Sequence, residues 1–306
     1  MESYCGIPVV DVDESLPTEE VSRCLVSALR DVGFAYIKNS GITQKELDAT
    51  FKLSARFFDL PIAVKMLYKF PTEENKRPHT FVPPENERFD NLLLDVKEAL
   101  DLVNDDDYVW PSQEHVPGFK KAVSDFESSI NTLGYRILSL IIKGLKCENP
   151  DLLRDLFERG DSHIFRLVDY PKIADLSELE PGQMRCSAHT DYGGFTILFQ
   201  DDCGGLQVMN REGEYVDALP LAGTALINIG DFLAMCSNGQ LKSTCHRVLV
   251  SEKNFQKRRQ SIVYFFDPDG NKMVQPESMS GDTLLPGPIC YNMWRNKRFQ
   301  DTRMLN

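Results

Sequence analysis

The chain has 306 residues, 42% of them hydrophobic, so it can bury a sizeable core as one large domain or two small ones. Its formal net charge of −12 argues against nucleic acid or an anionic membrane as a partner, because either favours a concentrated basic face. The eight cysteines form no C-x-x-C pair and are interpreted as reduced thiols. No secretory signal or membrane-length apolar stretch is evident, so we expect a cytoplasmic protein.

The first half of the chain is predicted to be largely helical. A short strand over residues 7–12 precedes an amphipathic helix over 19–31, a strand that begins at Gly33 and a second helix over 43–58. A long amphipathic helix is predicted over 119–146. Between these helices, residues 72–91 are rich in proline and charged residues, which indicates a surface loop of the kind that often borders a binding site.

The second half changes to short strand-like runs separated by glycine-containing turns. These runs cover residues 163–171, 195–199, 205–209, 224–229, 246–250 and 261–266. Strands at this spacing suggest a sandwich or a jelly roll. No internal repeat or linker separates the two halves.

The segment 183–200 contains His189 and Asp191 in an H-x-D pattern. Residues i and i+2 of an extended segment project from the same face, so an imidazole and a carboxylate could reach one ion. Of the other histidines, His79 and His115 are interpreted as loop residues and His163 as a strand residue. His246, which begins a strand-like run, is therefore the best third ligand.

Two imidazoles and one carboxylate suit a non-haem Fe(II) oxygenase, but the same set can form a zinc hydrolase site. Taken alone, an H-x-D pattern is more often a polar turn than a ligand set. The companion residues Arg259 and Ser261 open a strand and should share a face, where a guanidinium fork and a hydroxyl could hold one carboxylate. In isolation that basic stretch would be interpreted as a solvated turn.

Together, these motifs resemble the plant- and fungal-type Fe(II)/2-oxoglutarate-dependent dioxygenases related to isopenicillin N synthase. The resemblance covers essentially the whole chain. Its residues lie at 188–191, 198–208, 226–231, 237–239, 242–243, 246–248 and 259–261, with further similarity at 7–11, 33–37, 95–99 and 298–299.

The resemblance implies an α+β fold with a mainly β core. The core is a double-stranded β-helix, a cupin-like jelly roll with flanking helices from the N-terminal half. Residues 1–150 would form a helix-rich region packed on the barrel, and residues 151–306 the barrel and C-terminal tail, as one integrated catalytic unit. His189, Asp191 and His246 would bind Fe(II) and carry catalysis. Arg259 and Ser261 would hold the distal carboxylate of 2-oxoglutarate, with Tyr170 adding a hydrogen bond.

The implied reaction uses O2 and 2-oxoglutarate, releases succinate and CO2, and hydroxylates, desaturates or cyclises a small metabolite; ascorbate could serve as a reductant. The alternatives are an iron oxidase of the same fold that needs no 2-oxoglutarate, a non-catalytic binding relative, and a zinc hydrolase. The expected partner is a small-molecule substrate, with no nucleic acid or membrane, and the expected state is a monomer or weak oligomer.

Two sequence details concern the co-substrate. Val168 stands where many relatives have an asparagine, which removes one polar contact, and Arg258 competes with Arg259 for the carboxylate role. A larger set of residues is predicted to contact the substrate. The arginines in this set would suit an acidic substrate, although each of them could instead be a surface charge. The set comprises Arg77, Arg88 and the rest of the loop 77–89, Phe165, Arg185, Phe266, and Arg295 within the C-terminal segment 291–299.

Overall fold

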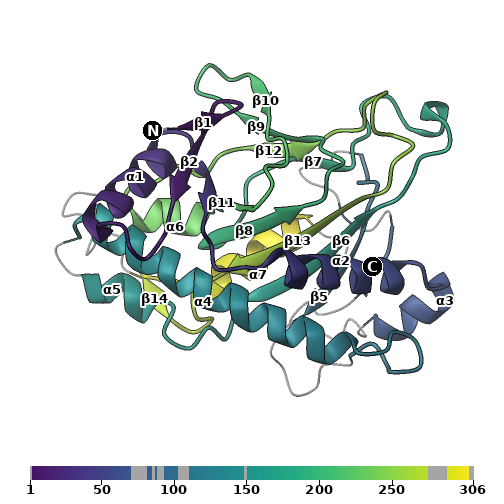
Figure 1. Ribbon diagram of the computed structural model, residues 1–306, viewed down its shortest axis with the longest axis horizontal. Coiled ribbons are helices and arrows are strands. Elements are labelled where there is room, and N and C mark those ends of the chain that lie inside the picture. Colours follow the sequence, from purple (N-terminus) through teal and green to yellow (C-terminus); the bar gives the residue numbers. More distant parts are fainter. Residues whose placement is uncertain are drawn as a thin grey trace.

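The computed structural model describes residues 2–69, 81–84, 87, 93–102, 110–147, 150–274 and 288–302. These residues form a large sheet and a small sheet that face each other, with helices on the outside (Figure 1). A short pair of strands, β14 (Met273–Val274) and β15 (Ile289–Cys290), stands apart from both sheets.

The large sheet has nine strands and takes them from both halves of the chain. Their order is β1 (Ser3–Tyr4), β2 (Ile7–Asp11), β3 (Phe34–Lys38), β11 (Thr224–Ile229), β8 (Phe195–Gln200), β13 (Arg259–Phe266), β6 (Ile164–Tyr170), β5 (Glu98–Leu102) and β4 (Phe81–Val82). All neighbouring strands are antiparallel except β2 and β3. Sequence reasoning missed β5 and so overstated the helical character of the first half.

The small sheet has four strands, in the order β10 (Tyr215–Asp217), β9 (Leu206–Met209), β12 (His246–Val248) and β7 (Cys186–His189). In Figure 1 it lies above the large sheet. An apolar layer joins the two, with Val168 and Leu226 from the large sheet and Leu206 and Val248 from the small one. This is the double-stranded β-helix that the sequence resemblance implied.

The helices cover the opposite face of the large sheet and its ends. They are α1 (Thr18–Asp31), α2 (Gln44–Phe58), α3 (Ile62–Lys65), α4 (Phe119–Leu145), α5 (Pro150–Asp155), α6 (Asp231–Cys236) and α7 (Tyr291–Thr302), with short 3-10 turns η1 (Met66–Tyr68) and η2 (Leu176–Glu178). The helix α2 begins with a capping box: Thr43 accepts from the Glu46 amide, and the Glu46 carboxylate accepts from the Thr43 amide.

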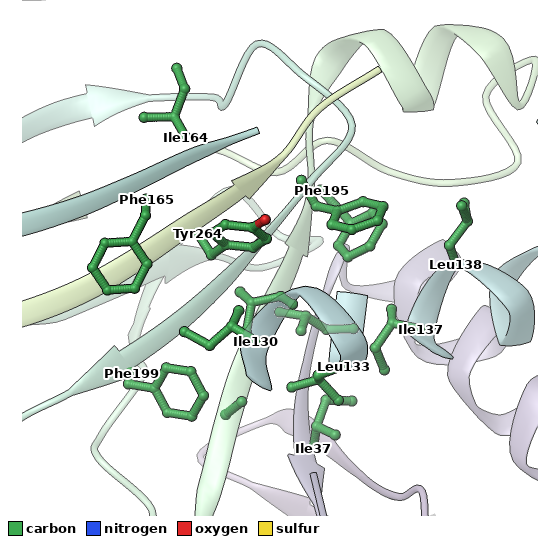
Figure 2. Packing of buried hydrophobic residues seen from close by; sticks show 14 of the residues in the cluster. Ile37, Ile130, Leu133, Ile137, Leu138, Ile164, Phe165, Phe195, Phe199 and Tyr264 are labelled. Atoms are coloured by element: carbon green, nitrogen blue, oxygen red, sulfur yellow. The ribbon is translucent and has the colours of Figure 1, made fainter. Parts of the chain in front are cut away.

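The long helix α4 packs against the large sheet and forms the main core. Ile130 and Leu133 of α4 meet Phe165 and Tyr264 from β6 and β13, whereas Ile164, one residue earlier on β6, points to the other face (Figure 2). Because successive strand residues alternate between faces, every second residue of β6 and β13 is free to line the space between the sheets.

At Gly134, α4 packs directly against the Phe266 ring of the sheet. A Cβ at this position would lie 2.4 Å from the Phe266 ring. We expect Gly134→Ala to destabilise the fold by about 1 to 2 kcal/mol, because overpacking outweighs the helix propensity that alanine adds. Urea denaturation measures the change, with the exposed Ser139→Ala in the same helix as the control. Equal or greater stability of Gly134→Ala would contradict this packing.

The predicted helices at 19–31, 43–58 and 119–146 and the strands of the second half are confirmed within one to two residues at most ends. The interpretation of His163 as a strand residue was wrong, because His163 lies one residue before β6. All eight cysteines are free thiols. The loop residues Arg77, His79 and Arg88 lie outside the described residues. Within the described residues, no helix combines the length and the apolarity needed to cross a membrane.

Candidate active site

A cavity of about 150 Å³ lies between the two sheets. His189, Asp191 and His246 line it, and so do Arg259 and Ser261. The residues that the sequence singled out from three separate segments therefore face the same cavity.

The two histidines come from neighbouring strands of the small sheet. His189 ends β7 and His246 begins β12, and the two residues are directly paired across these antiparallel strands. Asp191 follows two residues after the end of β7. The Nε2 atom of each imidazole lies 3.7 Å from Asp191 Oδ1. One ligand atom from each of the three residues falls within 4.8 Å of the others, a spacing that can hold a metal ion.

Hydrogen bonds orient each of these donor atoms toward the common point. The Nδ1 atoms of His189 and His246 lie 2.8 Å from the Ser187 carbonyl and 3.1 Å from the Thr244 carbonyl. A carbonyl only accepts, so each Nδ1 carries the proton and each Nε2 keeps its lone pair.

The Asp191 carboxylate is oriented in the same way. Its Oδ2 accepts hydrogen bonds from Thr196 on β8 and from Asn228 Nδ2 on β11, the latter at 2.7 Å. Its Oδ1 is therefore left to face the two imidazoles. Asn228 belongs to a motif that the resemblance had quoted, but sequence reasoning assigned no role to it or to Thr196.

The electrostatics of the three side chains also suit metal binding. Burial, together with the neighbouring His189, lowers the pKa of His246 to about 4, and burial lowers the pKa of His189 as well. Burial alone would raise the pKa of Asp191, but the two imidazoles, Thr196 and Asn228 together hold it below its ordinary value. At neutral pH the set is two neutral imidazoles and one carboxylate, the protonation state that a divalent metal requires.

The loop between the ligands is braced from α6. Asp231, the first residue of α6, accepts hydrogen bonds from Thr190 at 3.0 Å and from Ser243 at 2.6 Å. It also accepts one from Arg298 on α7 at 3.0 Å. This carboxylate ties the segment around the H-x-D pattern to the approach of the third histidine, which fixes the geometry of the site.

Arg259 also lines the cavity and is only 1% exposed. Its guanidinium donates to the Gly204 carbonyl at 3.0 Å, Gln200 Oε1 at 3.2 Å and Ser261 Oγ at 3.4 Å. It lies 4.7 Å from the centre of the Tyr170 ring, and Arg259 pairs with Tyr170 across β13 and β6. All of these partners are neutral. Among the described residues no carboxylate forms an ion pair with this buried cation, which favours an anionic ligand.

The structure also shows the positions of Arg258 and Val168, the two residues whose effect on the co-substrate the sequence left open. The Arg258 guanidinium is held by Asp169 and by Asp59, which directly follows α2, and Arg258 does not line the cavity. Val168 is buried opposite Ser261 and lines the cavity as an apolar wall.

Of the candidate substrate contacts, Arg295 lines the cavity, together with Tyr291 from the same helix. Glu87 of the predicted loop 77–89 lines the cavity too, whereas Arg185, Phe165 and Phe266 do not. Arg185 donates to the Asn254 and Lys257 carbonyls away from the cavity. Phe165 and Phe266 lie on the face of the sheet that packs against the helices.

The cavity also contains two charged residues that sequence reasoning did not select as contacts, Lys97 and Arg166. Lys97 belongs to the stretch 95–99, which the resemblance quoted without a role, and Arg166 belongs to the predicted strand 163–171.

The fold and the His-Asp-His geometry are those of a non-haem iron oxygenase. The sequence matches the 2OG-Fe(II) oxygenase superfamily over residues 162–268 and the N-terminal region of the non-haem dioxygenases in morphine synthesis over residues 7–119. The 2-oxoglutarate-Fe(II) type oxidoreductase ppzD of Metarhizium rileyi is 32% identical, over 83% of this chain and 77% of its own. The chain therefore belongs to the 2OG-Fe(II) oxygenase superfamily.

Two other relatives are described with specific small molecules. A homoarginine-6-hydroxylase of Glycine max is 29% identical, over 89% of this chain and 88% of its own. The crystal structure of a full-length Neurospora crassa protein in complex with alpha-KG and thymine superposes with a TM-score of 0.84, at 29% identity and with 96% of each chain covered. The protein is an oxidoreductase that uses Fe(II) and 2-oxoglutarate to oxidise small molecules.

Proposed function

We propose that His189, Asp191 and His246 hold Fe(II) and that Arg259, Ser261 and Tyr170 hold the distal carboxylate of 2-oxoglutarate. The bound metal would supply the activation of O2, and the protein's contribution is to bind, orient and exclude water. The observation that carries this proposal is the buried Arg259 guanidinium. Its hydrogen-bond partners in the described part of the chain are neutral, and it shares one cavity with the three ligands.

Apolar residues of the cavity wall support the same assignment. Val168 and Leu198 of the large sheet and Leu206 and Val248 of the small sheet line the same cavity as Arg259 and the three ligands. They suit the methylene carbons of a dicarboxylate whose charged ends are held by Arg259 at one end and by a metal at the other. Val168 thus substitutes packing for the polar contact that an asparagine would make.

The test is succinate formation in the presence of Fe(II), O2 and 2-oxoglutarate with a panel of amino acids, nucleobases, amines and phenolics. We expect at least one compound to raise succinate formation, with one equivalent of succinate per substrate oxidised. Substrate oxidation without succinate would instead support an iron oxidase that needs no 2-oxoglutarate. Zinc-dependent hydrolysis without O2 consumption would revive the zinc hydrolase.

We also propose that residues 1–150 and 151–306 act as one catalytic unit, because strands of the first part flank those of the second on both sides of the large sheet. We still predict a small-molecule substrate, no nucleic-acid or membrane partner, and a monomer or weak oligomer. The net charge of −12 and the cavity between the sheets support the first two of these predictions. The free thiols agree with the predicted cytoplasmic location.

A further inference from the structure

Gln200, the last residue of β8, lies beside the proposed co-substrate anchor Arg259. It is directly paired with Ser261 across β8 and β13, and its Oε1 accepts a hydrogen bond from Arg259 Nη2 at 3.2 Å. Arg259 and Ser261 line the cavity, whereas Gln200 does not. Gln200 therefore contacts the anchor from behind and acts on a ligand in the cavity only through Arg259.

Two hydrogen bonds fix which way the Gln200 amide points. Its Nε2 donates to the Ala218 carbonyl at 3.2 Å, and its Oε1 accepts from Arg259. A carbonyl only accepts and a guanidinium only donates, so the reversed amide would lose both hydrogen bonds. Ala218 is itself held in place, because it is fully buried and its amide donates to the Leu206 carbonyl at 2.8 Å. Gln200 thus presents a neutral oxygen to Arg259 in a single orientation.

Three neutral acceptors each take a different nitrogen of the Arg259 guanidinium. Nε donates to the Gly204 carbonyl at 3.0 Å, Nη1 to Ser261 Oγ at 3.4 Å, and Nη2 to Gln200. Nε carries a single N–H and each terminal nitrogen carries a pair, so these bonds leave one donor on Nη1 and one on Nη2. Donors on both terminal nitrogens match the two oxygens of a carboxylate. The acceptors therefore set the direction in which Arg259 can take a ligand.

The carboxylate next to Gln200 in the sequence, Asp201, is engaged elsewhere. Its Oδ2 accepts from the Gln260 amide at 2.5 Å and its Oδ1 from the Cys203 amide at 3.0 Å. Burial raises the pKa of Asp201, while the Gln260 amide and the charge of Arg259 act to lower it, so Asp201 feels the cation without forming an ion pair with it. A glutamate at position 200, in contrast, would place a charged oxygen directly against the Arg259 guanidinium.

We propose that Gln200 is a positioning residue that determines the preference for a dicarboxylate co-substrate, an inference that rests on the proposed role of Arg259. The neutral amide orients the guanidinium toward the cavity and leaves its charge without a direct counter-ion. That charge then serves the distal carboxylate of 2-oxoglutarate. A carboxylate at position 200 would pair with Arg259 itself and compete with the co-substrate. The selectivity of the anchor thus depends on the neutrality of the residue behind it.

The first experiment titrates the full chain, loaded with Fe(II) without O2, with two 2-oxo acids and follows the charge-transfer absorption. One is 2-oxoglutarate, and the other is 2-oxopentanoate, which has a methyl group in place of the distal carboxylate. We expect Gln200→Glu to raise the Kd for 2-oxoglutarate about 30- to 100-fold and that for 2-oxopentanoate less than about threefold. An unchanged Kd for 2-oxoglutarate, or equal losses for both acids, would overturn the inference.

The second experiment adds a variant without a new charge and a matched control. Gln200→Met removes the acceptor but keeps the length of the side chain, and we expect it to raise the Kd for 2-oxoglutarate about 3- to 10-fold, again with little effect on 2-oxopentanoate. The control is Gln207→Glu, because Gln207 Oε1 accepts from the Arg247 guanidinium at 2.9 and 3.1 Å and neither residue lines the cavity. Equal effects of Gln207→Glu and Gln200→Glu would contradict the assignment.

Arg259→Gln, titrated in the same way, separates this inference from the function on which it rests. If Arg259→Gln loses affinity for 2-oxoglutarate and Gln200→Glu does not, the proposed co-substrate site stands and the role of Gln200 is refuted. If Arg259→Gln binds 2-oxoglutarate as the unmodified chain does, the proposed site itself is refuted, and the role of Gln200 with it. A loss in both variants that spares 2-oxopentanoate supports the two assignments together.

Discussion

Replacing Asp191 with alanine is expected to abolish Fe(II) binding and to reduce 2-oxoglutarate turnover about a thousandfold or more. The carboxylate lies 3.7 Å from both imidazole Nε2 atoms and contributes the only negative charge among the three candidate ligands. Without it, two neutral imidazoles remain, and these cannot offset the charge of a divalent ion in a buried site. Anaerobic calorimetric titration with Fe(II) measures the loss directly.

The matched control for this substitution is Asp202→Ala, which removes one carboxylate from an exposed turn in the same half of the chain. It should bind Fe(II) as the unmodified chain does. Circular dichroism and the melting temperature of metal-free Asp191→Ala distinguish a lost ligand from a lost fold. Retention of full Fe(II) affinity by a folded Asp191→Ala would refute the assignment of the metal centre.

Arg259→Gln is expected to cost about 2 to 4 kcal/mol of 2-oxoglutarate binding free energy, or about 30- to 1000-fold in Kd. The reason is the loss of a buried cation whose present partners are the Gly204 carbonyl, Gln200 and Ser261, all of them neutral. Fe(II) affinity should stay unchanged, because Arg259 does not contact the candidate ligands. Equilibrium titration of the anaerobic Fe(II) protein with 2-oxoglutarate measures the effect.

Arg258→Gln is a well-matched control, since it removes the same charge one residue earlier on the opposite face. Arg258 is paired with Asp59 and Asp169 outside the cavity, so its loss should lower stability modestly and leave the 2-oxoglutarate Kd unchanged. If both variants weakened co-substrate binding to the same extent, the cause would be the change in net charge or a folding defect. That result would contradict a specific role of Arg259 in binding 2-oxoglutarate.

The candidate ligands could be predicted because their chemistry is visible in short segments. His189 and Asp191 are two residues apart, and few histidines were available as a third ligand. Arg259 and Ser261 also share a face through strand alternation alone. The structure adds the long-range part: β7 and β12 pair so that His246 lies opposite His189, and β13 pairs with β6 so that Arg259 lies opposite Tyr170.

The residues that would contact the substrate were predicted less well. Strand alternation shows which residues share a face, but it does not show which face lines the cavity. Phe165 and Phe266 were assigned to the cavity, but they belong to the face that packs on α4, whereas Ile164 and Arg166 face the cavity. Similarly, Arg185 and Arg295 look alike in the sequence. Only packing shows that Arg185 is held by backbone carbonyls and that Arg295 lines the cavity.

By itself, the sequence determined the order of most helices and strands, the three candidate ligands and the Arg259–Ser261 pair, because hydrophobic period and residue chemistry are local properties. The tertiary structure alone decided which charged residues meet around the cavity. Glu87, Lys97 and Arg166 come together because β5 adds to the edge of the sheet beside β6, and Arg295 joins the cavity because α7 docks on Tyr192. These contacts join residues that are far apart in the sequence. They depend on strand register and helix docking, which short sequence patterns do not determine.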